Sequence, residues 1–283
     1  MQEALIKIKA EDGAVLALWK SWADENANGQ HILLTHGTFS NRKVLKGITT
    51  YLVSQGFTCW SFEWRNHGAS SPSPSPFDFE TIGQKDFPLI LDFLFDTQGI
   101  SHLHAVTHSG GGICLTLALI AHPQYRDRFR SISMFACQAF GAAHSRVNHL
   151  QILLGKYASK TLGYIPAQML GGEENEPYHF MQQWFDWNLT KEFIGRSGID
   201  YKVKMKDIKV PIFAVFGEGD LFIAPPVGCK QFLAAFDNPQ NQSLLCGKVH
   251  GFAENYNHSR ILHSRAASRE IYPAVLDWIH QHI

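Results

Sequence analysis

Short runs of β-branched and aromatic residues alternate with helical patterns over most of the chain. Residues 5–9 and 15–20 alternate polar and apolar positions around Asp12-Gly13, which predicts a hairpin of the kind that often forms an antiparallel sheet edge. Further strands are predicted at residues 32–35, 57–62, 103–107, 131–137, 212–216 and 243–246, and helices at residues 42–54, 81–95, 111–121, 226–236 and 266–282. This order predicts an α/β fold, with a mostly parallel eight-stranded sheet flanked by helices.

The alternation stops between residues 138 and 207, where no clear strand is predicted and aromatic residues are frequent. We therefore expect a core domain of residues 1–137 and 208–283, into which residues 138–207 are inserted as a helical cap. An insertion at this point leaves the sheet at its carboxyl edge, where open α/β sheets build their binding sites. Trp184 and Trp187 share one face of a predicted helix, so they either pack on the core or line a substrate pocket.

Charge and composition narrow the class of partner. The chain has 283 residues, 45% of them hydrophobic, and its 25 Lys and Arg residues balance its 25 Asp and Glu residues. A nucleic-acid-binding protein shows a basic excess or a basic stripe, and this sequence has neither. We therefore expect a neutral or apolar small molecule as the partner and no nucleic acid.

The N-terminal residues, the longest apolar run and the cysteines bear on the cellular compartment and on metal binding. The N-terminal residues alternate polar and apolar positions without a signal core, and the apolar run at residues 113–121 is too short to span a bilayer. We expect a cytoplasmic protein without stable membrane insertion, and we leave its oligomeric state open. The cysteines do not cluster at metal-ligand spacing, so we expect reduced core thiols and no metal site. They are Cys59, Cys114, Cys137, Cys229 and Cys246.

A candidate nucleophile, Ser109, lies between a predicted strand and a predicted helix, within Thr107-His108-Ser109-Gly110-Gly111. That is the context of the nucleophile elbow, a tight turn that exposes a serine hydroxyl and needs small residues two positions before and after it. Gly111 meets this demand, whereas Thr107 stands where glycine is usual. The alternatives are a structural glycine-rich turn or a phosphate-binding loop, but the lysine of a P-loop is absent.

A serine nucleophile needs a base, and the base needs an acid that orients it. Asp220 follows the predicted strand 212–216 at its carboxyl end, and we take it as the acid, with Glu218 as the alternative. His250 follows the last predicted strand, and that position favours it as the base. His258 and His263 are the alternatives.

The loop that follows the first parallel strand, His36-Gly37-Thr38-Phe39, supplies an oxyanion-hole N–H in such a fold. We assign the backbone N–H groups of Thr38 and Gly110 to this hole, with Phe39 as the alternative to Thr38. Phe39 is also a candidate substrate-binding residue. We expect structural roles for His36, and likewise for two other histidines, His67 and His108.

Taken together, these motifs resemble the α/β-hydrolase superfamily over almost the whole chain, in order and in spacing. They include Arg65-Asn66-His67-Gly68-Ala69-Ser70. Within the superfamily, Gln183-Trp184, residues 201–211 and residues 86–93 are distantly similar to acid-lipase-like enzymes. The resemblance implies carboxylic-ester hydrolysis by a serine hydrolase, a helical cap and no cofactor. Two departures are Thr107 at the elbow and the lack of a secretory signal.

The implied mechanism is a two-step acyl transfer through an acyl-enzyme on small to medium apolar esters. Thioester or amide hydrolysis, aminopeptidase activity and acyl transfer to an alcohol would use the same triad. A ligand-binding protein without catalysis on the same fold is the alternative from another class.

Overall fold

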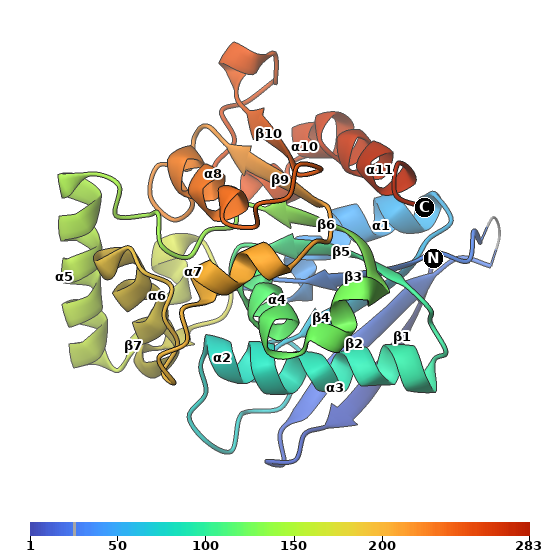
Figure 1. Ribbon diagram of the computed structural model, residues 1–283, viewed down its shortest axis with the longest axis horizontal. Helices are drawn as coiled ribbons and strands as arrows, with labels where there is room; N and C mark the ends of the chain where they lie inside the picture. The colour runs from blue at the N-terminus through green and yellow to red at the C-terminus, as the bar shows by residue number, and fades with distance from the viewer. Residues whose placement is uncertain (25–26) are drawn as a thin grey trace.

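Eight strands form one twisted sheet in the computed structural model, which describes residues 1–24 and 27–283, with the side chains of residues 169 and 170 excepted. The strand order is β1-β2-β4-β3-β5-β6-β9-β10 (Figure 1). The strands are β1 Gln2–Lys9, β2 Val15–Trp22, β3 His31–Thr35, β4 Thr58–Glu63, β5 Leu103–His108, β6 Phe129–Phe135, β9 Ile212–Gly217 and β10 Gln242–Cys246. β1 and β2 are antiparallel, as is the pair of β2 with β4, and all other neighbours are parallel. The predicted fold class is confirmed.

Helices cover both faces of this sheet (Figure 1). One face carries α1 Lys46–Ser54, α9 Arg260–His263, α10 Arg265–Glu270 and α11 Tyr272–His280. The other carries α2 Phe79–Thr81, α3 Phe87–Asp92 and α4 Gly110–Ala121. α8 Pro226–Ala234 lies beside β9 at the β10 end of the sheet. The layers follow from the strand pattern, because Ile32 and Leu34 of β3 pack on the first face while Leu33 packs on the second.

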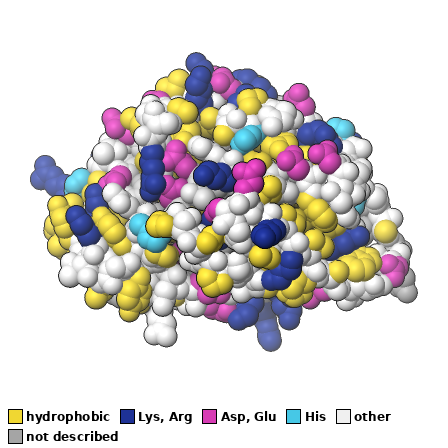
Figure 2. All heavy atoms as spheres, turned by 90° about the horizontal axis from the view of Figure 1, so that it is seen from below, with side chains coloured by type: hydrophobic (Ala, Val, Ile, Leu, Met, Phe, Trp, Pro, Cys, Tyr) yellow, Lys and Arg dark blue, Asp and Glu magenta, His cyan; other side chains and the backbone are white. Residues whose placement is uncertain are grey.

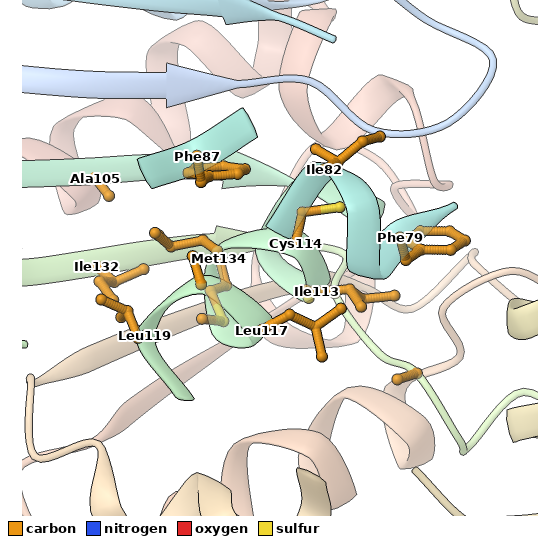
Figure 3. Packing of buried hydrophobic residues seen from close by; sticks show 14 of the residues in the cluster. Phe79, Ile82, Phe87, Ala105, Ile113, Cys114, Leu117, Leu119, Ile132 and Met134 are labelled. Carbon is orange, nitrogen blue, oxygen red and sulfur yellow. The ribbon is translucent and has the colours of Figure 1, made fainter. Parts of the chain in front are cut away.

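Helix α4 lies in the hydrophobic cluster on the face of the sheet that also carries α2 and α3. All residues from Gly110 to Leu119 are buried, as expected for a helix that is apolar on every side. Figure 3 shows Ile113, Cys114 and Leu117 of this helix packed among Ile82 and Phe79 of the preceding segment. A helix buried to this degree holds the turn at its amino end in a fixed position.

Several helices differ from their predicted extent. The predicted helix 81–95 is α2, α3 and two π-helical turns, Ile82–Asp86 and Phe93–Thr97. The predicted closing helix 266–282 is divided between α10 and α11 at Ile271, because Pro273 has no N–H for a helical hydrogen bond and begins a new helix. The short helix α9 was not predicted.

Residues 138–207 leave the sheet after β6 and return before β9. They form α5 Arg146–Leu162 and α6 Tyr178–Thr190, which lie together at the left of Figure 1, and α7 Tyr201–Lys204, which lies nearer the centre beside α4. The expectation of no strand here is wrong in one place. A two-stranded antiparallel ribbon, β7 Tyr164–Ile165 and β8 Glu176–Pro177, joins α5 to α6. Its strands have two residues each, too short for a pattern of alternating polarity to be detected.

The face shown in Figure 2 carries acidic and basic side chains interspersed with apolar ones. This distribution matches the balanced charge of the sequence. No helix in the described ranges is long and apolar enough to cross a membrane. The five cysteines are all free and buried, as expected.

A buried ion pair links the loop after β4 to the segment before α3. Arg65 donates through Nε to Asp86 Oδ2 at 2.8 Å and through a terminal nitrogen to Asp86 Oδ1 at 2.5 Å. The exposed fraction of the Arg65 side chain is 1%, and that of Asp86 is 0%. Two of the motifs that suggest the superfamily are thus joined by one bidentate contact.

We predict that Arg65→Met lowers the free energy of unfolding by about 3–5 kcal/mol, because it leaves the Asp86 carboxylate buried without its cation. Urea unfolding of the purified variant measures this. Arg260→Met is the matched control, since Arg260 makes a bidentate pair with Glu254 at the surface. The control should lose no more than about 1 kcal/mol. Equal losses for the two variants would contradict the prediction.

Candidate active site

Ser109 occupies the turn between β5 and α4. Its backbone has φ 52° and ψ −124°, outside the regions that residues with a side chain favour. The Ser109 N–H donates to the Phe135 carbonyl of β6 at 2.8 Å. Ser109 is 8% exposed, and it lines a cavity. This is the geometry of a nucleophile elbow.

Close approach of two glycines permits this turn. A Cβ on Gly37 would lie 2.6 Å from the Ser109 Cβ, and a Cβ on Gly111 would lie 2.6 Å from the His36 carbonyl oxygen. Both distances are shorter than real contacts, so the loop after β3, the elbow and the start of α4 are packed together only because these residues lack side chains.

Thr107, the departure from the usual elbow motif, is accommodated by Gly112. Thr107 is buried, and an added Cβ on Gly112 would lie 3.0 Å from the Thr107 Oγ1 and 2.6 Å from the Cys137 Sγ. The extra side chain of Thr107 therefore uses space that the third glycine leaves free. The turn at Ser109 keeps its elbow conformation.

A hydrogen-bonded chain runs from Ser109 through His258 to Asp220. His258 Nε2 lies 2.9 Å from Ser109 Oγ, and His258 Nδ1 lies 2.6 Å from Asp220 Oδ2. An ionised carboxylate only accepts hydrogen bonds, so Nδ1 carries the proton and Nε2 is left to accept from the hydroxyl. This is the arrangement of a serine, histidine and aspartate triad.

Asp220 is held in its ionised form. It lies in the loop after β9, is 3% exposed, and its Oδ1 accepts from the N–H groups of Ile223 and Ala224, each at 3.1 Å. Burial alone would raise the pKa of this carboxyl. The facing His258 and the two N–H donors outweigh burial and lower the pKa below its ordinary value.

The structure does not place His250 in the site. His250 ends a single 3-10 turn directly after β10 and is exposed, whereas the chain runs eight residues further before His258 meets Ser109 and Asp220. The prediction of His250 is therefore wrong in its geometry, and the alternative His258 takes its place. Glu218, the alternative acid, packs against Gly247, where an added Cβ would lie 2.0 Å from its Oε2.

A signal for His258 is present in the acid loop. An added Cβ on Gly217 would lie 2.0 Å from the Tyr256 carbonyl oxygen, and one on Gly219 would lie 2.5 Å from that of Asn255. The Gly219 N–H donates to the same Tyr256 oxygen at 2.9 Å. These two glycines leave room for a returning chain at residues 255–256. The residue that reaches Asp220 is therefore the histidine just beyond that contact.

His108 holds the backbone of His258. Its Nε2 lies 2.9 Å from the His258 carbonyl oxygen, which can only accept, so Nε2 carries a proton. Burial and the neighbouring His258 lower the pKa of His108 to about 3, which keeps the ring neutral at ordinary pH. The structural role expected for His108 is thus a specific contact to the candidate base.

His36 fixes the orientation of the peptide that carries the Thr38 N–H. Its Nε2 accepts from the Trp64 N–H at 3.2 Å, so its Nδ1 is protonated and donates to the Gly37 carbonyl at 2.7 Å. In a planar trans peptide the N–H points away from the carbonyl, so the Thr38 N–H is turned from His36. The structural role predicted for His36 fits these contacts.

Thr38 and Gly110 lie close to each other in the cavity that contains Ser109. An added Cβ on Gly110 would lie 3.4 Å from the Thr38 Cγ2, and both residues line the cavity that contains Ser109. Neither N–H donates to another group in the described part of the chain. The alternative donor Phe39 is excluded, because its N–H donates to Glu176 Oε1 at 2.8 Å.

Two cavities of about 210 Å³ each meet at this point. The first holds Ser109 and Gly110 and is lined mainly by apolar side chains of α5 and α6, among them Ile152 and Met181. The second holds His258 and His108 and has a mixed lining, which is more polar than that of the first, so we call it the polar cavity. Its polar members include Asn41, Lys43, Ser259, His263 and Glu173. Thr38, Phe39 and Ile223 border both.

Of the three aromatic residues predicted to bind substrate, two line the apolar cavity and one packs in the core. Phe39 and Trp184 line the apolar cavity. Trp187 does not line it, because its Nε1 donates to the Ile194 carbonyl at 2.8 Å and its ring packs on Phe193, with centroids 4.8 Å apart. Its candidacy as a substrate-binding residue is therefore wrong, and packing is its role. Within the described ranges no group of three His, Cys, Asp or Glu residues could hold a metal ion.

Comparison with known proteins agrees with this architecture. The sequence model of the family described as "alpha/beta hydrolase fold" matches residues 30–136. An esterase from Exiguobacterium antarcticum superposes with a TM-score of 0.69 at 13% identity, over 97% of this chain and 98% of the other. The protein has the α/β-hydrolase fold.

Two further solved structures share the α/β-hydrolase fold with this chain. A thermophilic esterase from Thermogutta terrifontis, with malate bound, has a TM-score of 0.64 at 16% identity, over the full length of both chains. A hydrolase from Pseudomonas aeruginosa has a TM-score of 0.64 at 17% identity, over 97% of this chain and 98% of the other. No curated protein matches the chain by sequence.

We predict that Gly112→Ala destabilises the protein by about 1–3 kcal/mol, because the new methyl group meets the Cys137 Sγ in a packed core. Urea unfolding, supported by thermal unfolding, measures the change in the free energy of unfolding. In the Cys137→Ala background the same substitution should lose much less, since the sulfur is gone. A full loss in that background would show that the contact with Cys137 is not the cause.

Proposed function

We propose that the protein is a serine hydrolase that cleaves carboxylic esters with an apolar acyl chain through an acyl-enzyme intermediate. The observation that carries this proposal is the chain of hydrogen bonds from Ser109 through His258 to Asp220, beside two N–H groups without other acceptors. The esterases among the solved structures of this fold support the reaction class.

In the first step Ser109 Oγ attacks the ester carbonyl and His258 Nε2 takes the hydroxyl proton. Asp220 holds the tautomer that this transfer needs and stabilises the imidazolium that forms. The developing oxyanion is bound by the N–H groups of Thr38 and Gly110, each contributing about 3 kcal/mol in comparable sites. The amino end of α4 adds its dipole at the same point.

His258 then gives its proton to the leaving alcohol, and the ester C–O bond breaks to leave the acyl group on Ser109. A water molecule enters beside His258, loses a proton to Nε2 and attacks the acyl carbonyl. Collapse of the second tetrahedral intermediate releases the carboxylic acid and returns the proton to Ser109.

We assign the two parts of the substrate to the two cavities. The alcohol must lie on the side of the general acid, because His258 protonates its oxygen, and that side is the polar cavity. The acyl chain then lies in the apolar cavity beside Ser109. This arrangement favours esters that join an apolar acid to a small or polar alcohol.

We further propose that residues 138–207 form a cap over a core of residues 1–137 and 208–283. Side chains of α5 and α6 line the apolar cavity, and Gly171, Gly172 and Glu173 border the polar one. An insertion that contributes to both cavities would select the substrate and exclude water from the acyl-enzyme. Hydrolysis of thioesters or amides, and acyl transfer to an alcohol, would use the same catalytic residues. These reactions differ in the leaving group or the acyl acceptor that the polar cavity would hold.

We predict that Ser109→Ala and His258→Ala each reduce ester turnover on the order of a million-fold, since each removes a member of a unit that acts together. Initial rates on 4-nitrophenyl butyrate measure this, and labelling by a fluorophosphonate probe should be lost in both variants. His250→Ala is the matched control and should keep wild-type activity within about twofold. If wild-type protein neither hydrolyses esters nor takes up the probe, the protein is a ligand-binding relative instead.

We predict that ethyl octanoate is a better substrate than its isomer octyl acetate by about a hundredfold in kcat/KM, because the long chain lies on the acyl side in the first ester only. Each methylene buried in the apolar cavity adds about 0.8 kcal/mol until the cavity is full. A pH-stat assay compares the two esters directly.

Gly155→Leu tests the same assignment, since an added Cβ on Gly155 has only an ordinary contact, 3.7 Å from the Phe185 ring, and a longer side chain would enter the cavity. This variant should lose activity on ethyl octanoate and keep it on ethyl acetate. Equal rates on the two isomers, or an equal loss on both ethyl esters, would reverse or remove the assignment of the cavities.

A further inference from the structure

We propose that Glu176 is a positioning residue that fixes the oxyanion loop, residues 37–39, and so makes the oxyanion hole depend on the inserted segment. The inference rests on the proposed function for its kinetic consequence, but its structural part stands without it. Glu176 belongs to β8, more than a hundred residues away from this loop in sequence, and its side chain is completely buried.

One oxygen of Glu176 joins two loops of the core. Its Oε1 accepts from the Phe39 N–H at 2.8 Å and lies 3.0 Å from His67 Nε2, in the loop after β4. Phe39 has φ 61°, a left-handed conformation that is unfavourable for an aromatic residue. The hydrogen bond from its N–H therefore compensates for backbone strain next to Thr38.

The other side of the Phe39 residue is held by the same segment. The Phe39 carbonyl accepts from the N–H groups of Glu173 at 2.8 Å and of Glu174 at 3.2 Å. An added Cβ on Gly172 would lie 2.3 Å from that carbonyl oxygen, so the segment lies directly against it. The N–H and the carbonyl of Phe39 are thus both bonded to residues 173–176, and the neighbouring Thr38 N–H is turned by His36 on its other side.

The contact between Glu176 and His67 requires a charge. His67 Nδ1 lies 2.7 Å from the Arg65 carbonyl, which can only accept, so Nδ1 carries a proton. A neutral ring would then present an unprotonated Nε2 to the Glu176 carboxylate. Burial disfavours the charge on His67, but Glu176 outweighs burial and raises the pKa, so His67 donates through both nitrogens.

A glutamine at position 176 could not satisfy these contacts. Its amide oxygen could accept from the Phe39 N–H, but a charged His67 would then be buried without a counter-ion. Glu176 Oε2 has no hydrogen-bond partner in the described part of the chain. A buried carboxylate with one unpaired oxygen lowers the stability of the fold. Its position between two loops of the site gives a reason why a glutamate is present there.

The test compares Glu176→Gln with Glu192→Gln, a matched change at an exposed position of residues 138–207 that lines neither cavity. We expect Glu176→Gln to lower kcat on an octanoyl ester by about 10–100-fold with KM within threefold, because only the transition state uses the oxyanion hole. Hydrogen exchange at the amides of residues 36–41 should become faster in this variant. Glu192→Gln should change neither property.

His67→Gln provides a second route, which also serves if Glu176→Gln does not fold. It should reproduce both effects, and the double variant should lose no more than about threefold beyond either single one, because the two residues act as a pair. Unchanged exchange at residues 36–41 in both variants, or a kcat loss equal to that of Glu192→Gln, would overturn the proposal. If the wild-type protein hydrolyses no ester, the proposed function fails and the exchange measurement alone decides the role of Glu176.

Discussion

The strained turn at Ser109 is the constraint on which the site depends. A non-glycine residue at φ 52° and ψ −124° costs about 1–3 kcal/mol, and the surrounding structure has to hold it there. It is held by β5 on one side and by the fully buried helix α4 on the other. This geometry leaves no room for side chains at the positions that pack against the turn, and these positions are Gly37 and Gly111. The same close packing brings Thr38 next to Gly110.

The carboxyl ends of parallel strands bring the remaining groups to this turn, but strand order alone does not select the histidine. β5, β9 and β10 end at one edge of the sheet, and the loops after them contain Ser109, Asp220 and both His250 and His258. The 3-10 turn after β10 carries His250 outward. The chain then folds back over Gly217 and Gly219, and His258 is the first histidine beyond that contact. Position relative to a strand predicts the loop, whereas the path within the loop decides the residue.

Most of the fold could be predicted because its signals are local. The hairpin, the eight strands and the insertion each follow from patterns within a few residues, and Ser109 and Asp220 lie at element boundaries that those patterns define. What could not be predicted depends on contacts between distant segments. The two-residue ribbon β7–β8 has no periodicity of its own, and its Glu176 acquires a role only through Phe39 and His67. The separation of Trp184 from Trp187 likewise depends on which neighbour each ring meets.

The inserted segment contributes to every part of the site except the triad itself. Its helices α5 and α6 line the apolar cavity, residues 171–173 border the polar one, and Glu176 bonds the loop that carries Thr38. Under the proposed function, one segment would therefore bind the acyl chain, accommodate the alcohol and support the oxyanion hole. A movement of this segment that widened the apolar cavity would also release the Phe39 N–H and carbonyl, since residues 173–176 hold both. Under the proposed function, that short stretch of backbone would couple substrate binding to transition-state stabilisation.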